Sequence, residues 1–390
     1  MTKFYDYIIA GAGCAGLSLL MRMMQDPFFS QKKILIVDAS GKTLNDRTWC
    51  FWEKSPDIFE PIVHHCWNKL DFFSETYTAE LSISPYTYKM IQGLTFYNYV
   101  KSEAERHSNV SWLKETIRGL ASPETDEEGK PLSGIVLGDR SIYAEYVFNS
   151  IQFEPIRPEP HQYYLQQHFK GWTIQTKEPF FDPGKATFMD FRVSQEHGTT
   201  FMYVLPTSAT TALVEYTLFT KDLLSPDSYD IALKRYITEY LHIPEYEIVH
   251  EEFGIIPMTN AILPKANGGI VYIGIAGGQV KASSGYAFRF IQKKTAAIVD
   301  ALKNRRTVSV KAGFPDTKGL LYDSTLLHIL YHQKMGGSDI FSRIFRHNRA
   351  SDVLAFLDNE SSLLTDLKIM SSVPTGIFLP AALRELKHLL

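Results

Sequence analysis

The most constraining feature of this chain is a glycine-rich turn between two apolar segments near its N-terminus. The sequence DYIIAGAGCAGLSLLMRMM starts with a short apolar run, passes through the spacing GxGxxG and continues with apolar residues at helical spacing. A second apolar run follows and ends on Asp38. This order of strand, glycine turn, helix and strand is the context in which GxGxxG indicates a βαβ unit that binds a dinucleotide.

The three glycines of this turn have different expected tasks. Gly11 permits the tight turn, Gly13 lets the backbone approach a pyrophosphate, and Gly16 lets the helix pack closely on the strand. Unpaired N–H groups at the start of the helix would then face the phosphates. Asp38 lies 22 residues after Gly16, where an acidic side chain accepts hydrogen bonds from a ribose. We predict that these four residues bind the cofactor; a glycine turn without a phosphate is the alternative.

Size and composition limit the class of protein. The chain has 390 residues, of which 45% are hydrophobic and 21% charged, enough for two domains or one elaborated domain with a large core. Three scattered cysteines indicate a reducing compartment and neither a disulfide framework nor a zinc site, so we expect no metal. We also expect no signal peptide and no transmembrane helix, because no apolar run approaches roughly 20 residues.

Charge is distributed unevenly along the chain. Residues 281–350 contain 13 Lys or Arg against four Asp, a charge of +9, whereas the whole chain carries −3 and the remainder therefore −12. A basic face with interspersed apolar residues suits an anionic membrane surface. A solvated helical face is the alternative. We expect no nucleic-acid partner, because no nucleic-acid motif accompanies the charge.

The order of predicted elements indicates a nucleotide-binding domain interrupted by a β-rich insertion. Alternating residues over 68–100 and 163–220 predict antiparallel strands, and helices are predicted over 101–108, 227–241 and 288–303. A flavin enzyme would be built this way, whereas a nicotinamide dehydrogenase usually keeps its nucleotide domain continuous. We predict an α/β fold with three parts: a Rossmann-like domain from 1–70, 110–155 and 250–305, a substrate-binding antiparallel β-sheet domain from 71–109 and 156–249, and a helical C-terminal region at 306–390.

A second glycine cluster is a further candidate for cofactor binding. The stretch GIVYIGIAGGQVKASSGYAF at 269–288 is predicted to form a strand-to-helix turn. There Gly274, Gly277 and Gly278 would let the backbone come close to a flat cofactor and offer it N–H groups. A tight turn without a ligand is the alternative.

Glu215 is the main candidate for proton chemistry, because it lies in an otherwise apolar strand. A carboxyl in an apolar pocket has a raised pKa, so it retains a proton at neutral pH and acts as a general acid. From the strand pattern alone, however, an outward-facing or arginine-paired glutamate is the favoured interpretation, and proton chemistry is the alternative. Asp190 and Arg192 are candidates for orienting this site, or equally for a structural salt bridge.

Six short motifs occur in a fixed order along the chain. They are DRTWCFW (46–52), FMDFRVSQ (188–195), YVLP (203–206), LVEYT (213–217), GIIPM (254–258) and GIAGGQVKASSGYAF (274–288). Together they resemble the motif series of the bacterial and plant lycopene β-cyclase family. The resemblance implies a flavoprotein fold and FAD, active in its reduced form with NAD(P)H as the reductant, and it adds Arg47 to the cofactor-binding residues.

The same resemblance implies a reaction. Each linear end of lycopene would close into a β-ring without net redox change, through proton addition, closure of the cation and proton loss. The first acidic residue of the family motif falls on Glu215, whereas the second falls on Tyr216, a departure from the family pattern. The threonine of a later motif is Ser284 here, which retains the hydroxyl. Either Glu215 or the flavin would deliver the proton.

The expected partners follow from this substrate. They are lycopene, its monocyclic intermediate and the cytoplasmic side of the cell membrane, to which the protein would bind peripherally. Two alternatives remain: an isoprenoid-modifying flavin reductase or hydroxylase of related fold, and a flavin- or carotenoid-binding protein without catalysis. Gly274-Ile275 argues against an ordinary hydroxylase, because hydroxylases commonly carry Gly-Asp at this turn.

Overall fold

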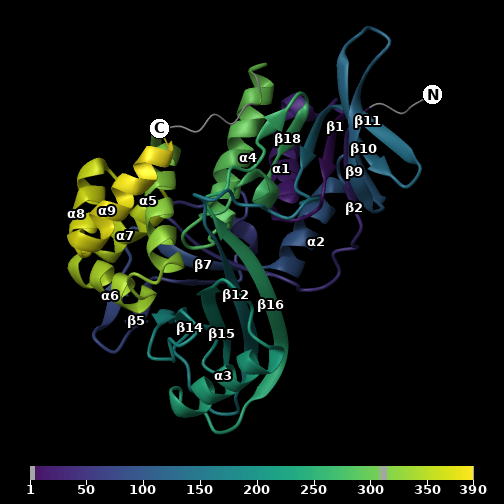
Figure 1. The fold of residues 1–390 in the computed structure, drawn as a ribbon. Helices are drawn as coiled ribbons and strands as arrows, with labels where there is room; N and C mark the ends of the chain where they lie inside the picture. Colours follow the sequence, from purple (N-terminus) through teal and green to yellow (C-terminus); the bar gives the residue numbers. More distant parts are fainter. Residues whose placement is uncertain (1–4, 307, 309–313, 390) are drawn as a thin grey trace.

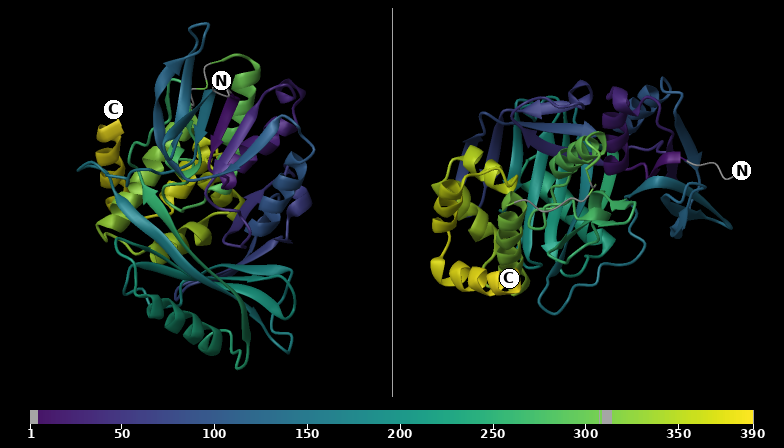
Figure 2. Two further views of the ribbon diagram at one scale, coloured as in Figure 1. Left: turned by 90° about the vertical axis from the view of Figure 1, so that its right-hand side faces the viewer. Right: turned by 90° about the horizontal axis from the view of Figure 1, so that it is seen from above.

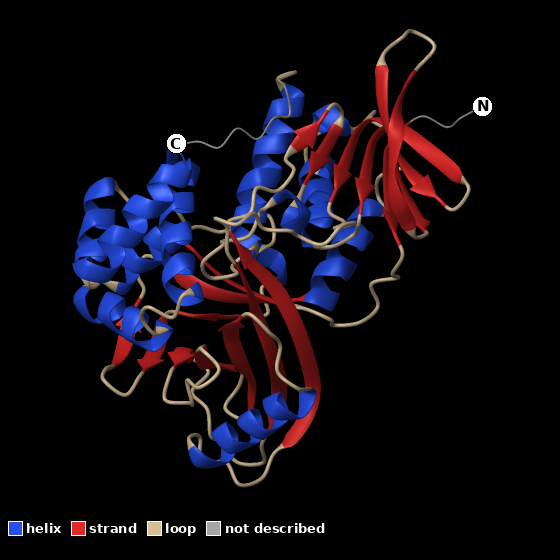
Figure 3. Ribbon diagram, viewed as in Figure 1, coloured by secondary structure: helices blue, strands red, loops and turns tan. Residues whose placement is uncertain are grey.

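The computed structural model describes residues 5–306, 308 and 314–389, and folds them into an α/β arrangement of three sheets and surrounding helices (Figures 1 and 3). Parts of two predicted ranges lie outside the described residues: 1–4 of the range 1–70, and 307, 309–313 and 390 of the range 306–390. Lys311 of the basic segment is one of these residues. In Figure 1 the first sheet, which contains the N-terminal strand, lies above the second, seven-stranded sheet, and the C-terminal helices stand beside them. The α/β class predicted from the sequence is confirmed.

The first sheet is built from segments that are far apart in the chain. Its central strands are parallel, because β1 pairs with both β2 and β11, and the outer pairs β2–β8 and β11–β18 are also parallel. A β9–β10 hairpin extends from β11 and covers one face. The strands are β1 (Tyr5–Ala10), β2 (Ile34–Asp38), β8 (Val110–Lys114), β9 (Ile117–Thr125), β10 (Pro131–Leu137), β11 (Arg140–Asn149), β17 (Ala266–Asn267) and β18 (Ile270–Tyr272).

Helices α1 (Cys14–Met24), α2 (Gly93–Ala104) and α4 (Phe288–Lys303) cover the other face of this sheet. The bounds of α4 are those predicted, whereas α2 begins eight residues before the predicted 101. Phe96 and Val100 of α2 are fully buried in the same core as α1. The first sheet and these three helices are called the first layer below. Helix α2 therefore packs within the first layer, although 71–109 was predicted as part of the β-rich domain.

The second sheet is mostly antiparallel and has the order β16-β12-β15-β14-β13-β5-β6. Helix α3 (Pro226–Glu239) covers one face, where Val214 and Tyr216 of β15 are buried, while Leu213 and Phe219 face the opposite core. This alternation follows from the two-residue period of a strand. The strands are β5 (Lys69–Phe73), β6 (Thr78–Ser82), β12 (Tyr164–Gln175), β13 (Lys185–Asp190), β14 (Thr199–Pro206), β15 (Thr211–Thr220) and β16 (Glu247–Thr259).

A small third sheet and the C-terminal helices complete the fold (Figure 2). Leu327 and Leu354 from the helices enter one core with Trp52 of the small sheet and Phe188 of the second sheet. The small sheet contains β3 (Thr48–Glu53), β4 (His65–Trp67) and β7 (Thr87–Gln92), and the helices are α5 (Phe314–Tyr331), α6 (Gly337–His347), α7 (Ala350–Leu357), α8 (Leu363–Ser371) and α9 (Thr375–Leu389).

The glycine turn after β1 is closely packed at one of its glycines and open at another. Gly11 has φ +99°, a conformation that favours glycine. A Cβ on Gly16 would lie 2.1 Å from the carbonyl oxygen of Gly11, so the helix packs directly on the turn. A Cβ on Gly13 would meet nothing within 4 Å. Gly13 therefore faces the open side of the turn, where the sequence predicts the pyrophosphate.

This contrast predicts different effects of alanine at the two positions. Gly16→Ala should lower the free energy of unfolding by about 1–3 kcal/mol, because overpacking forces the backbone to shift. Gly13→Ala, the matched control, should change it by less than about 1 kcal/mol. Denaturant unfolding of flavin-free protein measures both values, and equal stability of the two variants would contradict the close packing described for Gly16.

Candidate active site

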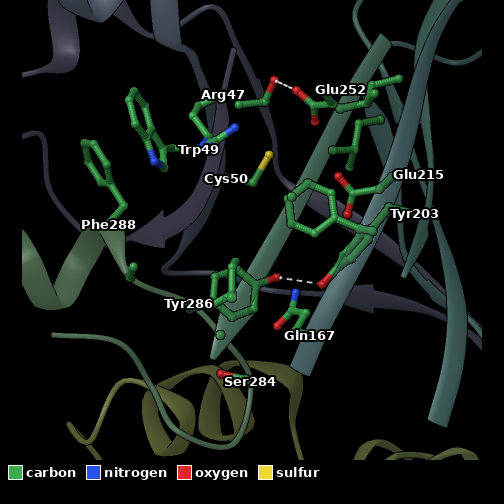
Figure 4. Close-up of a pocket in the computed structure, with 18 of the residues that line it drawn as sticks. Arg47, Trp49, Cys50, Gln167, Tyr203, Glu215, Glu252, Ser284, Tyr286 and Phe288 are labelled. Atoms are coloured by element: carbon green, nitrogen blue, oxygen red, sulfur yellow. Dashed lines mark hydrogen bonds between the residues drawn. The ribbon is translucent and has the colours of Figure 1, made fainter. Parts of the chain in front are cut away.

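A cavity of about 210 Å³ lies between the second sheet and the first layer (Figure 4). One wall comes from β12, β15 and β16, and the other from β3 and from the segment between α4 and the 3₁₀ turn η3 (Gly274–Gly277). Most of its lining is apolar or aromatic, and the aromatic residues are Trp49, Tyr88, Phe169, Tyr203, Tyr286 and Phe288.

Two carboxyl groups enter this cavity from strands on either side of β12. Glu215 of β15 and Glu252 of β16 both pair in register with Gly171 of β12. Directly opposed residues project on the same face of a sheet, so both side chains point the same way. A Cβ on Gly171 would lie 2.9 Å from Leu213 Cδ1 and 3.1 Å from Glu252 Cγ. The missing side chain of Gly171 therefore leaves room for the two carboxyls.

Glu215 is held in its acid form at neutral pH. Burial among apolar groups, followed by the negative charge of Glu252, raises the pKa of Glu215 to about 8. One hydrogen bond opposes this effect, because Thr217 Oγ1 donates to Glu215 Oε1 at 2.8 Å. Glu215 thus lies in the wall of a largely apolar cavity.

Glu252 is the functional candidate that sequence reasoning missed. Its Oε2 accepts a hydrogen bond from Thr48 Oγ1 at 2.6 Å. Burial raises the pKa of Glu252, while the Thr48 hydroxyl and the charges of His250 and Arg47 oppose the rise. The interaction between the two carboxyls raises the pKa of Glu215 and lowers that of Glu252. The alternation of strand residues just before the GIIPM motif was the only signal in the sequence that pointed to Glu252. The register of the sheet is what shows that Glu252 and Glu215 both lie opposite Gly171 on one face.

Three tyrosines form a neutral polar chain in the cavity wall. Tyr286 Oη lies 3.3 Å from Tyr88 Oη and 3.2 Å from Tyr203 Oη. Burial raises the pKa of all three far above the ordinary value for tyrosine, so they stay uncharged at neutral pH. Their ring faces are rich in electron density and attract a nearby cation.

Two buried polar atoms in the cavity have no hydrogen-bond partner within the described chain. They are Ser284 Oγ and Gln167 Oε1. Between them, Gly285 has φ +71°, and a Cβ on it would lie 2.0 Å from Gln167 Oε1. Buried polar groups are almost always paired in proteins, so these two are available to a bound ligand.

The two predicted glycine turns meet. A Cβ on Gly274 would lie 3.0 Å from the Cβ of Ala15 at the start of α1. On the other side of the first turn, Asp38 Oδ2 accepts a hydrogen bond from the Ala12 amide at 2.7 Å. Together with the open position above Gly13, this cradle fits the predicted dinucleotide. Of the remaining predicted cofactor residues, Gly11 and Gly16 belong to the first turn and Arg47 lines the cavity. Gly277 and Gly278 line a neighbouring pocket that shares Ile275 with the cavity.

Asp190 and Arg192 do not reach the cavity. Asp190 is fully buried at the end of β13, where it accepts hydrogen bonds from Arg192 Nε at 2.9 Å and from Tyr236 Oη of α3 at 2.7 Å. This geometry fits the structural salt bridge that the sequence left open. Tyr216, at the second acidic position of the family motif, also faces α3, where its ring contacts Tyr229 edge-on.

A metal centre finds no support in the described ranges, where no three His, Cys, Asp or Glu side chains converge as ligands. The cavity itself presents a proton-bearing carboxyl, a second carboxyl and aromatic walls.

Comparison with solved structures shows the fold. The chain superimposes on a geranylgeranyl bacteriochlorophyll reductase-like protein from Thermoplasma acidophilum with a TM-score of 0.60, 13% identity and full coverage of both chains. A flavin-dependent halogenase from Xanthomonas campestris gives a TM-score of 0.59 at 10% identity, covering 100% of this chain and 96% of the halogenase. The fold is thus one found in flavin-dependent enzymes.

Comparison of sequences is more specific. A lycopene β-cyclase from Pseudescherichia vulneris is 23% identical over 310 residues, which are 76% of this chain and 74% of that protein. A lycopene β-cyclase from Pantoea ananas is 25% identical over 274 residues, 66% of this chain and 64% of that protein. The family model described as lycopene cyclase protein matches residues 6–382. The chain belongs to the lycopene cyclase family.

Proposed function

We propose that this protein is a lycopene β-cyclase, which closes the linear ends of lycopene into β-rings without net redox change. The observation that carries the proposal is Glu215, a carboxyl that holds its proton at neutral pH inside an aromatic cavity. Family membership supports the substrate class. The product would be β-carotene, with the monocyclic carotenoid as the intermediate.

Glu215 is suited to the first step. Protonation of an alkene requires an acid that is well positioned and reluctant to ionise. The proton would leave Glu215 for the terminal double bond, which becomes a tertiary cation, and the next double bond would attack that cation to close the ring. The rings of Tyr203 and Tyr286 can stabilise the positive charge, and an apolar wall keeps away water that would quench it.

The cofactor cradle supports a flavin at this site. Reduced FAD, kept reduced by NAD(P)H, would supply negative charge beside the developing cation. The first glycine turn and Asp38 would hold the pyrophosphate and ribose, and Gly274, Gly277 and Gly278 would approach the flavin ring. Ser284 Oγ and Gln167 Oε1 are the unpaired polar atoms that a cavity ligand would satisfy.

The first test of this function is a product analysis. Purified protein incubated anaerobically with lycopene, FAD and NADPH should give ring-containing products of unchanged mass. NADPH consumption should stay far below one per ring, because cyclisation is an isomerisation. A gain of two daltons with stoichiometric NADPH oxidation would indicate the alternative, an isoprenoid reductase, and unchanged lycopene would indicate a binding protein.

Glu215→Gln tests the acid directly. The variant keeps the size of the side chain but cannot transfer a proton, so turnover should fall by about 100-fold or more. In the wild type, turnover should fall as pH rises through about 8, because the acid form of Glu215 is lost above its pKa. The pH profile and flavin content of both proteins provide the measurement; near wild-type turnover of the folded variant would remove Glu215 from the mechanism.

We further propose that the protein binds the membrane surface through the outer face of α8 and α9. Acids from elsewhere in the fold pair with several cations of the basic segment 281–350, including Lys293 with Glu360 and Lys303 with Asp26. That segment therefore offers less free charge than its sequence suggests. No described helix has both the length and the apolar character needed to cross a bilayer.

The outer face of α8 and α9 combines apolar and cationic groups. Both acids of these helices are buried: Asp366 pairs with Lys318, and Glu385 accepts a hydrogen bond from Tyr163. The exposed leucines include Leu364, at 80% exposure. Such a surface suits insertion at an anionic lipid interface, where a hydrocarbon substrate is dissolved. The face comprises Leu363, Leu364, Leu367, Lys368, Leu379, Leu383, Arg384, Leu386 and Lys387.

Vesicle sedimentation tests this surface. Binding to anionic vesicles should exceed binding to neutral ones and weaken as salt rises, since the screening length falls to about 3 Å at 1 M. Leu364→Ser with Leu367→Ser should reduce binding severalfold, because both leucines are exposed on α8. Ile231→Ser on α3, also well exposed, is the matched control and should bind as the wild type does. Equal binding of all three proteins would exclude this face.

A further inference from the structure

Ring closure leaves a cation that must still lose a proton, and no residue has so far been given that task. A cation of this kind has acidic C–H bonds on more than one neighbouring carbon, so the position of the base decides where the ring double bond forms. The base must be anionic or readily protonated, and it must face the same cavity as Glu215.

Glu252 meets these requirements by its geometry. Its carboxyl lines the cavity, and Thr48 fixes Oε2 by a hydrogen bond of 2.6 Å (Figure 4). The other oxygen, Oε1, would lie 3.5 Å from a Cβ on Gly171, which places it on the side of the strand that Glu215 shares. One oxygen is thus held in place and the other is free for the reaction.

We propose that Glu252 is the base that removes the ring proton and returns it to Glu215. The proposal rests on the cyclase function proposed above and names the residue that completes its reaction. It also makes Glu252 the residue that determines the position of the ring double bond.

The proton balance of this cycle closes within the cavity. The O–H bond of Glu215 breaks as a C–H bond forms on the substrate, and the electron pair of the next double bond forms the ring C–C bond. A ring C–H bond then breaks, its electron pair forms the ring double bond, and the proton goes to Glu252. Return of that proton from Glu252 to Glu215, which lines the same cavity, restores both groups. No electron is gained or lost.

The two carboxyls are suited to opposite roles. Burial raises the pKa of both groups, but Glu252 also accepts a hydrogen bond from Thr48 and lies near the positive charge of Arg47. When the pair shares one proton, Glu215 is therefore the member that holds it before the reaction. Two interacting carboxyls whose surroundings differ in this way commonly divide into acid and base.

Glu252→Gln is the central test, with Glu251→Gln as the matched control. Glu251 is the adjacent exposed acid, whose carboxylate pairs with Lys170 at 3.2 Å on the outer face of the sheet. With lycopene as the substrate, Glu252→Gln should lower turnover by about 100-fold and raise the share of products with a misplaced ring double bond. Glu251→Gln should match the wild type in rate and product.

The pH profile separates this role from a structural one. Removal of the Glu252 charge should lower the pKa of Glu215, so the alkaline fall in turnover should move to lower pH in Glu252→Gln. A variant that was merely less stable would lose active protein without this displacement. Flavin content and thermal unfolding report directly on folding.

Gly171→Ala supplies a second, independent variant. It retains both carboxyls, but its Cβ would lie 3.1 Å from Glu252 Cγ and enter the space between them. Turnover should fall at least tenfold, with normal flavin content. If the wild type cyclises lycopene while both Glu252→Gln and Gly171→Ala keep its rate and products, the role of Glu252 is wrong. If the wild type forms no rings, the proposed function itself fails.

Discussion

The register of β12 against its two neighbours is the constraint on which the candidate site depends. It sets Gly171 between Glu215 and Glu252, so that two carboxyls share a face with no side chain between them. Two carboxyls close together in an apolar cavity resist ionising simultaneously, and the pair therefore retains a proton at neutral pH. The acid strength proposed for catalysis is thus a property of three adjacent strands rather than of one residue.

The first layer provides the other half of the site. Its glycine turns bring two distant segments together at Gly274 and Ala15, and the segment that leaves the second turn carries Ser284 and Tyr286 into the cavity wall. A nucleotide bound on the first layer and a substrate bound against the second sheet would therefore meet over this segment. The core shared by Trp52, Phe188 and Leu354 fixes the small sheet and C-terminal helices beside them.

Much of this arrangement could be predicted from local patterns. The βαβ unit around Gly11 and Gly16, the helix at 288–303 and the apolar surroundings of Glu215 all follow from periodicity and spacing within one segment. Glu252 could not be found in this way, because its importance comes from pairing between strands that are about 40 and 80 residues apart along the chain. Asp190 was predicted either to orient the site or to form a structural salt bridge, and its contacts with Arg192 and Tyr236 turn it toward α3.

Side chains along β15 point alternately to the two faces of the sheet, so a change at one position need not affect its neighbour. Position 215 faces the cavity, whereas position 216 packs beside Tyr229 of α3. The two neighbours in the LVEYT motif therefore meet different surroundings, one the cavity and the other a helix. Substitutions at 216 should co-vary with residues of α3, and the loss of an acid there leaves the proton inventory of the cavity unchanged. A change at position 216 therefore alters the packing of β15 against α3 and leaves the groups that line the cavity in place.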